Sequence, residues 1–156
     1  MKKYILLIVS GIIGMNVYAQ QFNDYMEVSR EVLKTEKKAI VAEVMQLTEA
    51  ESAVFWPLYN EFQNKMYEVN TKRLNLIVDF AENFENMSEE KATEIINSSY
   101  SIDMELLKLE KSYAKKFTKI LVPQKALRYL QAENKIGALI DAELALEIPL
   151  LESIED

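Results

Sequence analysis

The stretch from Leu47 to Phe62 contains the clearest structural signal of the chain, and its sequence is Leu-Thr-Glu-Ala-Glu-Ser-Ala-Val-Phe-Trp-Pro-Leu-Tyr-Asn-Glu-Phe. It opens with a helix-start pattern, because the Thr48 hydroxyl can accept from the backbone N–H of Glu51 while the Glu51 carboxylate accepts from that of Thr48. Four aromatic residues follow within eight positions: Phe55, Trp56, Tyr59 and Phe62. The stretch therefore predicts the start of a long helix with an aromatic face.

A weaker copy of this stretch begins at Leu121, which aligns with Leu47. The other matching pairs are Phe55 with Tyr129, Trp56 with Leu130, and Asn60 with Asn134. Pro123 stands near the start of the copy, and the first turn of a helix tolerates a residue that has no N–H. The repeat therefore predicts two helix starts, at Thr48 and at Pro123.

The chain from residue 20 to residue 156 predicts a single all-α domain. The 156 residues include only three Gly and three Pro, whereas turn-rich β folds need more residues of this kind. Apolar residues recur at helical spacing, and Ser88 is expected to cap a helix. The expected helices are Asn23–Met45, Thr48–Phe84, a third from Ser88 to about Ile120, and a fourth from Pro123 to just before Pro149.

Two positions leave the helix geometry open. Pro57 removes a backbone donor and crowds the carbonyl four residues earlier, which predicts either a kink close to Ala53 or a fresh helix start at Pro57. The Asn97–Ser101 patch consists of weak helix formers and is a candidate bend in the third helix.

The first nineteen residues have the pattern of a secretory signal peptide. Lys2 and Lys3 precede the apolar run Tyr4–Ile13, and Val17-Tyr-Ala19 offers the small residues of a cleavage site. A retained membrane anchor fits less well, because the apolar run is short for a span. The sequence therefore predicts a periplasmic protein that has no stable membrane span after cleavage at Ala19.

Charge and composition exclude several classes of function. The net charge of −7 becomes about −9 without Lys2 and Lys3, which disfavours nucleic acid as a partner. The chain has no His and no Cys, so disulfides, Ser-His-Asp triads and His-based zinc sites are ruled out. Acidic residues near the Ser88 helix start are expected from the helix dipole alone: Glu82, Glu85, Glu89 and Glu90. No catalytic residue, metal or cofactor is predicted, and a small hydrolase would need a convergent pair of buried acids.

The expected binding surface lies on the second helix. Phe55, Tyr59 and Phe62 share one helix face and are expected in the core, whereas Trp56 lies off that face. Long helices leave much of their apolar face uncovered, which favours a homodimer or a polypeptide partner. The residues predicted for this surface are Trp56, Tyr59, Met66, Arg73 and Phe80. A wider set would suit an adaptable surface or, alternatively, belong to the ordinary core: Tyr67, Tyr100, Tyr113, Tyr129, Met66, Met87 and Met104.

The Leu47-Thr48-x-x-Glu51 start, its partner at Leu121 and the signal peptide resemble the Spy/CpxP family of periplasmic proteins with LTxxQ motifs. Glu51 and Lys125 stand where the two motifs have Gln, and Val122 replaces the second Thr. The resemblance implies an elongated, curved four-helix hairpin with two long helices that forms a cradle-shaped antiparallel dimer. It also implies an ATP-independent chaperone that holds unfolded polypeptides or, alternatively, a dedicated modulator of an envelope-stress sensor protein.

Overall fold

The structure is a computed structural model that describes residues 19–151, and of residues 19–29 and 31 it describes the backbone alone. The described part contains four α-helices: α2 (Ala19–Met45), α3 (Glu49–Asn83), α4 (Glu89–Ile120) and α5 (Pro123–Glu147), with the 3-10 helix η2 (Phe84–Asn86) after α3. The predicted all-α fold with four helices is confirmed. The predicted signal peptide lies, except for Ala19, outside the described residues.

The chain divides into two compact units. One, the hairpin unit, comprises Leu47–Leu127 and so contains α3, η2, α4 and the first turn of α5. The other, the flanking unit, comprises α2 and the part of α5 from Arg128 onward. Each unit is described by itself.

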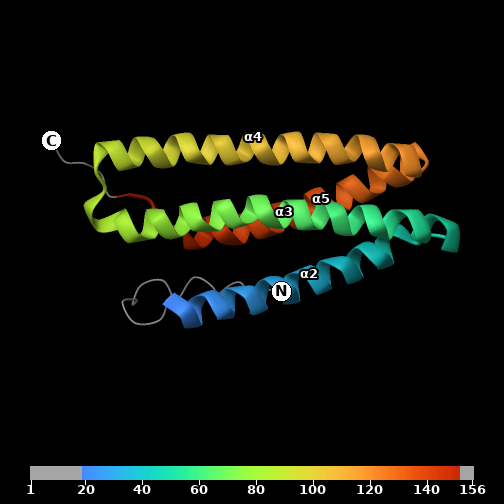
Figure 1. The fold of residues 1–156 in the computed structure, drawn as a ribbon, viewed down its shortest axis with the longest axis horizontal. Helices are drawn as coiled ribbons and strands as arrows, with labels where there is room; N and C mark the ends of the chain where they lie inside the picture. Colours follow the sequence, from blue (N-terminus) through green and yellow to red (C-terminus); the bar gives the residue numbers. More distant parts are fainter. Residues whose placement is uncertain (1–18, 152–156) are drawn as a thin grey trace. The chain divides into compact units, whose positions relative to one another are not determined.

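In the hairpin unit, α3 and α4 lie side by side and run in opposite directions, joined by a turn through η2 (Figure 1). Two ion pairs give the register: Lys116 with Glu61 at 2.8 Å and Lys72 with Glu105 at 2.7 Å. From the first pair to the second, α3 advances by eleven residues while α4 goes back by eleven. Eleven residues correspond to about 16 Å of helix, so the two helices keep a constant register over that length.

Both long helices run through the positions that weaken helices. Pro57 lies inside α3, so the predicted alternative of a fresh helix start at this residue is wrong. The helix begins at Glu49 instead, because the capping box of Thr48 and Glu51 satisfies backbone donors of its first turn. The weak helix formers Asn97–Ser101 lie within α4, which is uninterrupted from Glu89 to Ile120.

The flanking unit contains an ion pair between α2 and α5. The Lys37 ammonium lies 2.5 Å from the Glu133 carboxylate, and the two side chains are only 18% and 10% exposed. Val41, Met45 and Tyr129 in the same unit are buried. Within residues 19–151, no helix has an apolar stretch long enough to cross a membrane.

Gln46 ends α2 with an unusual backbone conformation. Its φ of 44° lies in the left-handed region, which glycine adopts freely and other residues adopt at a cost. Helices often end with a residue of this conformation. The two residues that follow lead directly to Glu49, the first residue of α3.

Candidate functional site

Capping interactions fix both ends of the α3–α4 hairpin. The Thr48 hydroxyl accepts from the Glu51 N–H at 3.3 Å, and the Glu51 carboxylate accepts from the Thr48 N–H at 2.9 Å. At the start of α4 the Ser88 hydroxyl accepts from the Lys91 N–H at 3.1 Å. Both helix starts therefore follow from local hydrogen bonding that the sequence encodes at these positions.

Glu51 also connects the start of α3 to the first turn of α5. Its carboxylate accepts a hydrogen bond from the Lys125 ammonium, 2.5 Å away. This bond, together with those from Thr48, holds the pKa of Glu51 below its ordinary value. Pro123 is the first residue of α5, where its missing N–H leaves no donor unsatisfied. The two predicted helix starts are thus joined by an ion pair between Glu51 and Lys125.

The base of the hairpin holds an aromatic core, which we define as Phe55, Tyr59, Phe62, Tyr113 and Phe117. All five side chains are buried, and Phe55 and Phe117 are fully so. The ring of Phe55 lies 5.6 Å from that of Phe117, and the ring of Phe62 lies 4.9 Å from that of Tyr113. Aromatic pairs at these distances contribute beyond the apolar area that they cover. The aromatic face of α3 is therefore the packing face of the hairpin.

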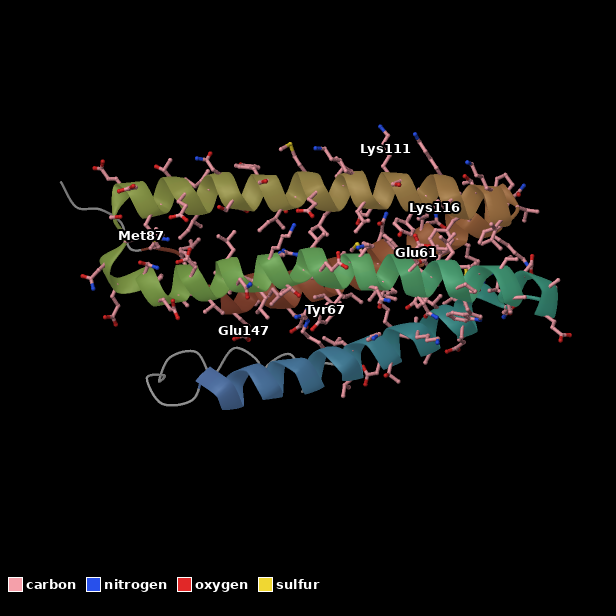
Figure 2. The ribbon with its side chains drawn as sticks, in the orientation of Figure 1. Glu61, Tyr67, Met87, Lys111, Lys116 and Glu147 are labelled. Atoms are coloured by element: carbon pink, nitrogen blue, oxygen red, sulfur yellow. The ribbon has the colours of Figure 1, made fainter. Side chains whose placement is uncertain are left out.

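A polar cluster borders this core. The Tyr113 hydroxyl donates to the Glu61 carboxylate at 2.6 Å, and the Lys116 ammonium donates to the same oxygen at 2.8 Å while lying 4.1 Å from the centre of the Tyr113 ring. Figure 2 shows Lys116 and Glu61 extending toward each other from α4 and α3. The hydrogen bonds from Lys116 and Tyr113 lower the pKa of Glu61, whereas burial, with the bond to Glu61, raises that of Tyr113. Every member of the cluster has a partner inside the hairpin, so the cluster serves to hold α3 and α4 in register.

Four of the five residues predicted for the binding surface are partly exposed: Trp56, Met66, Arg73 and Phe80. Trp56 borders the aromatic core, with its ring 5.0 Å from that of Phe55 in an edge-on arrangement. Tyr59 is predicted both for the core and for this surface, and the surface prediction is wrong. Its side chain is 2% exposed and its ring stacks on Phe55 at 5.8 Å, so it belongs to the core and is not accessible to a partner.

The side chains of the hairpin become less buried away from its base. We define the hairpin tip as residues 70–101, the region around the turn, in which no residue is buried. The tip nevertheless contains large apolar side chains. Ile96 and Tyr100 are exposed, and the others are partly exposed: Leu74, Leu76, Ile77, Val78, Phe80, Phe84, Met87 and Ile95. The rings of Phe80 and Phe84 contact each other edge-on at 5.6 Å. The apolar residues of the tip are therefore only partly covered.

A second apolar surface, outside the residues predicted for binding, follows the outside of α4. Ile96, Tyr100, Met104 and Leu107 form it, with exposed fractions of 56%, 68%, 56% and 64%. We call these four residues the α4 stripe. Tyr100 and Met104 belong to the tyrosines and methionines that the sequence predicts for an adaptable surface, whereas Tyr113 and Tyr129 of that set are buried. A spacing of four, four and three residues would have identified the α4 stripe as one helix face.

Polar side chains line a groove on the hairpin but do not gather into a metal site within the described residues. A shallow groove between α3 and α4 near the tip is bridged by the ion pair of Lys72 and Glu105. Across residues 19–151, no three acidic side chains lie close enough together to hold a metal ion.

Comparison with known proteins gave no relative. No protein-family model, no curated protein and no solved structure matches this chain.

Proposed function

We propose that the chain is a secreted, periplasmic protein that holds non-native polypeptides by weak, reversible apolar contacts, in the manner of the ATP-independent chaperones that its sequence resembles. The observation that carries this proposal is the hairpin tip, where large apolar side chains are present but none is buried. A protein that only needed a stable hairpin would cover these side chains as completely as those of the aromatic core. Apolar surface that remains accessible commonly marks a site for a partner.

The composition of the tip suits varied polypeptides. Phe80 and Met87 supply a flat ring and a flexible thioether, which adapt to partners of different shape. Arg73 is predicted for the binding surface and carries a cationic group. It lies in the tip together with the acidic Asp79 and Glu82. A mixture of both charges around apolar side chains favours binding that tolerates different client sequences.

An aggregation assay tests the proposal. A reduced, unfolding client protein is followed by light scattering with and without stoichiometric amounts of the purified chain, at low and high salt. We expect suppression under both conditions, because the contacts are apolar and salt screens only charges. Phe80→Ser should weaken the suppression, whereas Leu127→Ser, at a position that is 57% exposed outside the tip, should not.

Two results would lead to other conclusions. If the chain leaves aggregation unchanged at both salt concentrations, general client binding is refuted. If it then captures one protein selectively, the alternative of a dedicated partner for an envelope-stress sensor replaces the chaperone proposal. Export is tested separately by the N-terminal sequence of the protein recovered from the periplasm, which we expect to begin at Gln20.

A further inference from the structure

The groove between α3 and α4 begins in the hairpin tip and is built from one face of each helix. Its residues recur at intervals of three and four along both helices, which is the spacing of a single helix face. The residues that line it are Lys72, Asn75, Leu76, Asp79, Ser98, Ser101, Ile102 and Glu105. At the base of the hairpin, aromatic rings fill the space between the same two helices. Here small and polar side chains leave a groove of about 540 Å³.

The charged residues of the groove are already paired. The Lys72 ammonium lies 2.7 Å from the Glu105 carboxylate. The Asp79 carboxylate lies 3.3 Å from the ammonium of Lys91, which belongs to the same hairpin. Because each charge has its counter-charge beside it, the groove favours neither an anion nor a cation. Charge complementarity therefore points to a ligand without net charge.

The other side chains of the groove are suited to a neutral ligand that forms hydrogen bonds. Asn75, Ser98 and Ser101 have no hydrogen-bond partner within residues 19–151. One amide and two hydroxyls offer both donors and acceptors. Leu76 and Ile102 add apolar surface beside them. The groove thus combines donors, acceptors and apolar contacts without a net charge.

We propose that this groove receives the main chain of an extended client segment, with Asn75, Ser98 and Ser101 bonding its peptide groups. An extended main chain is neutral and offers a donor and an acceptor at each residue other than proline. The peptide groups of α3 and α4 are bonded within their own helices, so the bonds to a client have to come from side chains. The inference rests on the proposed function and deepens it, because bonds to the main chain do not depend on the sequence of the client.

The dimensions of the groove suit a short extended segment. Lys72 and Asp79 lie seven residues apart on α3, which corresponds to about 10 Å along the helix axis. An extended chain rises about 3.3 Å per residue, so about three residues span the groove. A helical client segment is a poorer occupant, because its peptide groups are already bonded within the helix and would leave Asn75, Ser98 and Ser101 unused.

Two model peptides with identical side chains test the inference. Both carry fluorescein and are about eight residues long, which exceeds the span of the groove at both ends. They are built from Ala, Leu, Ser and Gln in the same order. In the second peptide, ester bonds replace the central amides, which removes the main-chain donors and keeps the side chains. Fluorescence anisotropy with the purified chain should show that the ester peptide binds about fivefold more weakly or worse, the effect of at least one net hydrogen bond.

Substitutions on both helices test whether the groove is the place of binding. Asn75→Leu removes the amide but adds apolar surface, so it should weaken binding of the amide peptide about fivefold, whereas a purely apolar site would bind more tightly. Asn64→Leu, at an exposed position of α3 outside the groove, is its control. Ser98→Leu fills the groove and should weaken binding about fivefold or more. Ser99→Leu, at the neighbouring exposed position outside the groove, should leave it unchanged, and circular dichroism verifies that all four variants keep their helices.

The outcomes distinguish this inference from the proposed function. Equal affinity for the two peptides overturns main-chain binding, and so does tighter binding by Asn75→Leu. If neither peptide binds while the chain still suppresses aggregation, the inference fails and the proposed function stands. If the chain neither binds the peptides nor suppresses aggregation, both are refuted. Weaker binding of the ester peptide, together with losses confined to Asn75→Leu and Ser98→Leu, supports the inference.

Discussion

Replacing Phe117 with Ala should destabilise the chain much more than replacing Phe80 with Ala. Both residues are phenylalanines on the long helices of one hairpin, so the chemistry removed is identical. They differ in position, because Phe117 belongs to the aromatic core at the base and Phe80 belongs to the tip. The comparison therefore isolates packing.

The surroundings of each ring set the expected magnitudes. Phe117 is 0% exposed, and its ring lies 5.6 Å from that of Phe55 and 6.1 Å from that of Phe62. Removing a fully buried ring loses its transfer free energy and leaves a cavity, which together cost about 3–5 kcal/mol. Phe80 is partly exposed, so water and neighbouring side chains can fill the space that its ring leaves. Its loss should approach the transfer contribution alone, about 1–2 kcal/mol.

Urea unfolding measures both losses. Far-UV circular dichroism follows the helices, and the fluorescence of Trp56, the only Trp in the chain, follows the base because its ring lies 5.0 Å from that of Phe55. Coincident transitions from the two probes would justify two-state free energies. Equal losses for the two variants, or a larger loss for Phe80→Ala, would refute the description of the tip as incompletely packed.

Three further perturbations test local features. Thr48→Ala removes the capping box and should cost about 1 kcal/mol in urea unfolding, whereas Thr93→Ala inside α4 should cost clearly less. Gln46→Gly should stabilise the chain by up to about 1 kcal/mol in the same assay, because relief of the left-handed strain exceeds the added backbone entropy; a loss of stability would contradict the strain. The pKa of Glu61 is lowered in the fold, so its contribution is present above its unfolded pKa of about 4.3 and is lost as pH falls through the folded pKa. Stability measured from pH 7 down to pH 3 should therefore fall less steeply in Glu61→Gln than in the natural chain, and parallel curves would show that the ion pair contributes nothing.

The helix starts could be predicted from the sequence because each depends on chemistry within a few residues. Thr48 and Glu51 satisfy each other's backbone donors, Ser88 accepts from a residue three positions on, and Pro123 occupies a first turn. None of these interactions requires knowledge of what packs where. The aromatic core could be predicted for the same reason, since the spacing of Phe55 and Phe62 defines one helix face.

The surfaces could not be predicted in the same way. Tyr59 lies on the periodic face of α3, and only the hairpin register determines that its position falls at the packed base and that of Phe80 at the open tip. On α4 the apolar residues form two faces, represented by Ile102 and by Tyr100. Periodicity separates these two faces, but it cannot say which of them receives the neighbouring helix.

Pro57 has a consequence for how α3 opens. Because it has no N–H, it cannot donate to the carbonyl of Ala53, and the first two turns of α3 are joined to the rest by one hydrogen bond fewer. Those turns are secured at their far end by Glu51 and its partner Lys125. We therefore expect amide hydrogens just before Pro57 to exchange with solvent faster than those just after it, as a local opening that spares the remainder of the helix.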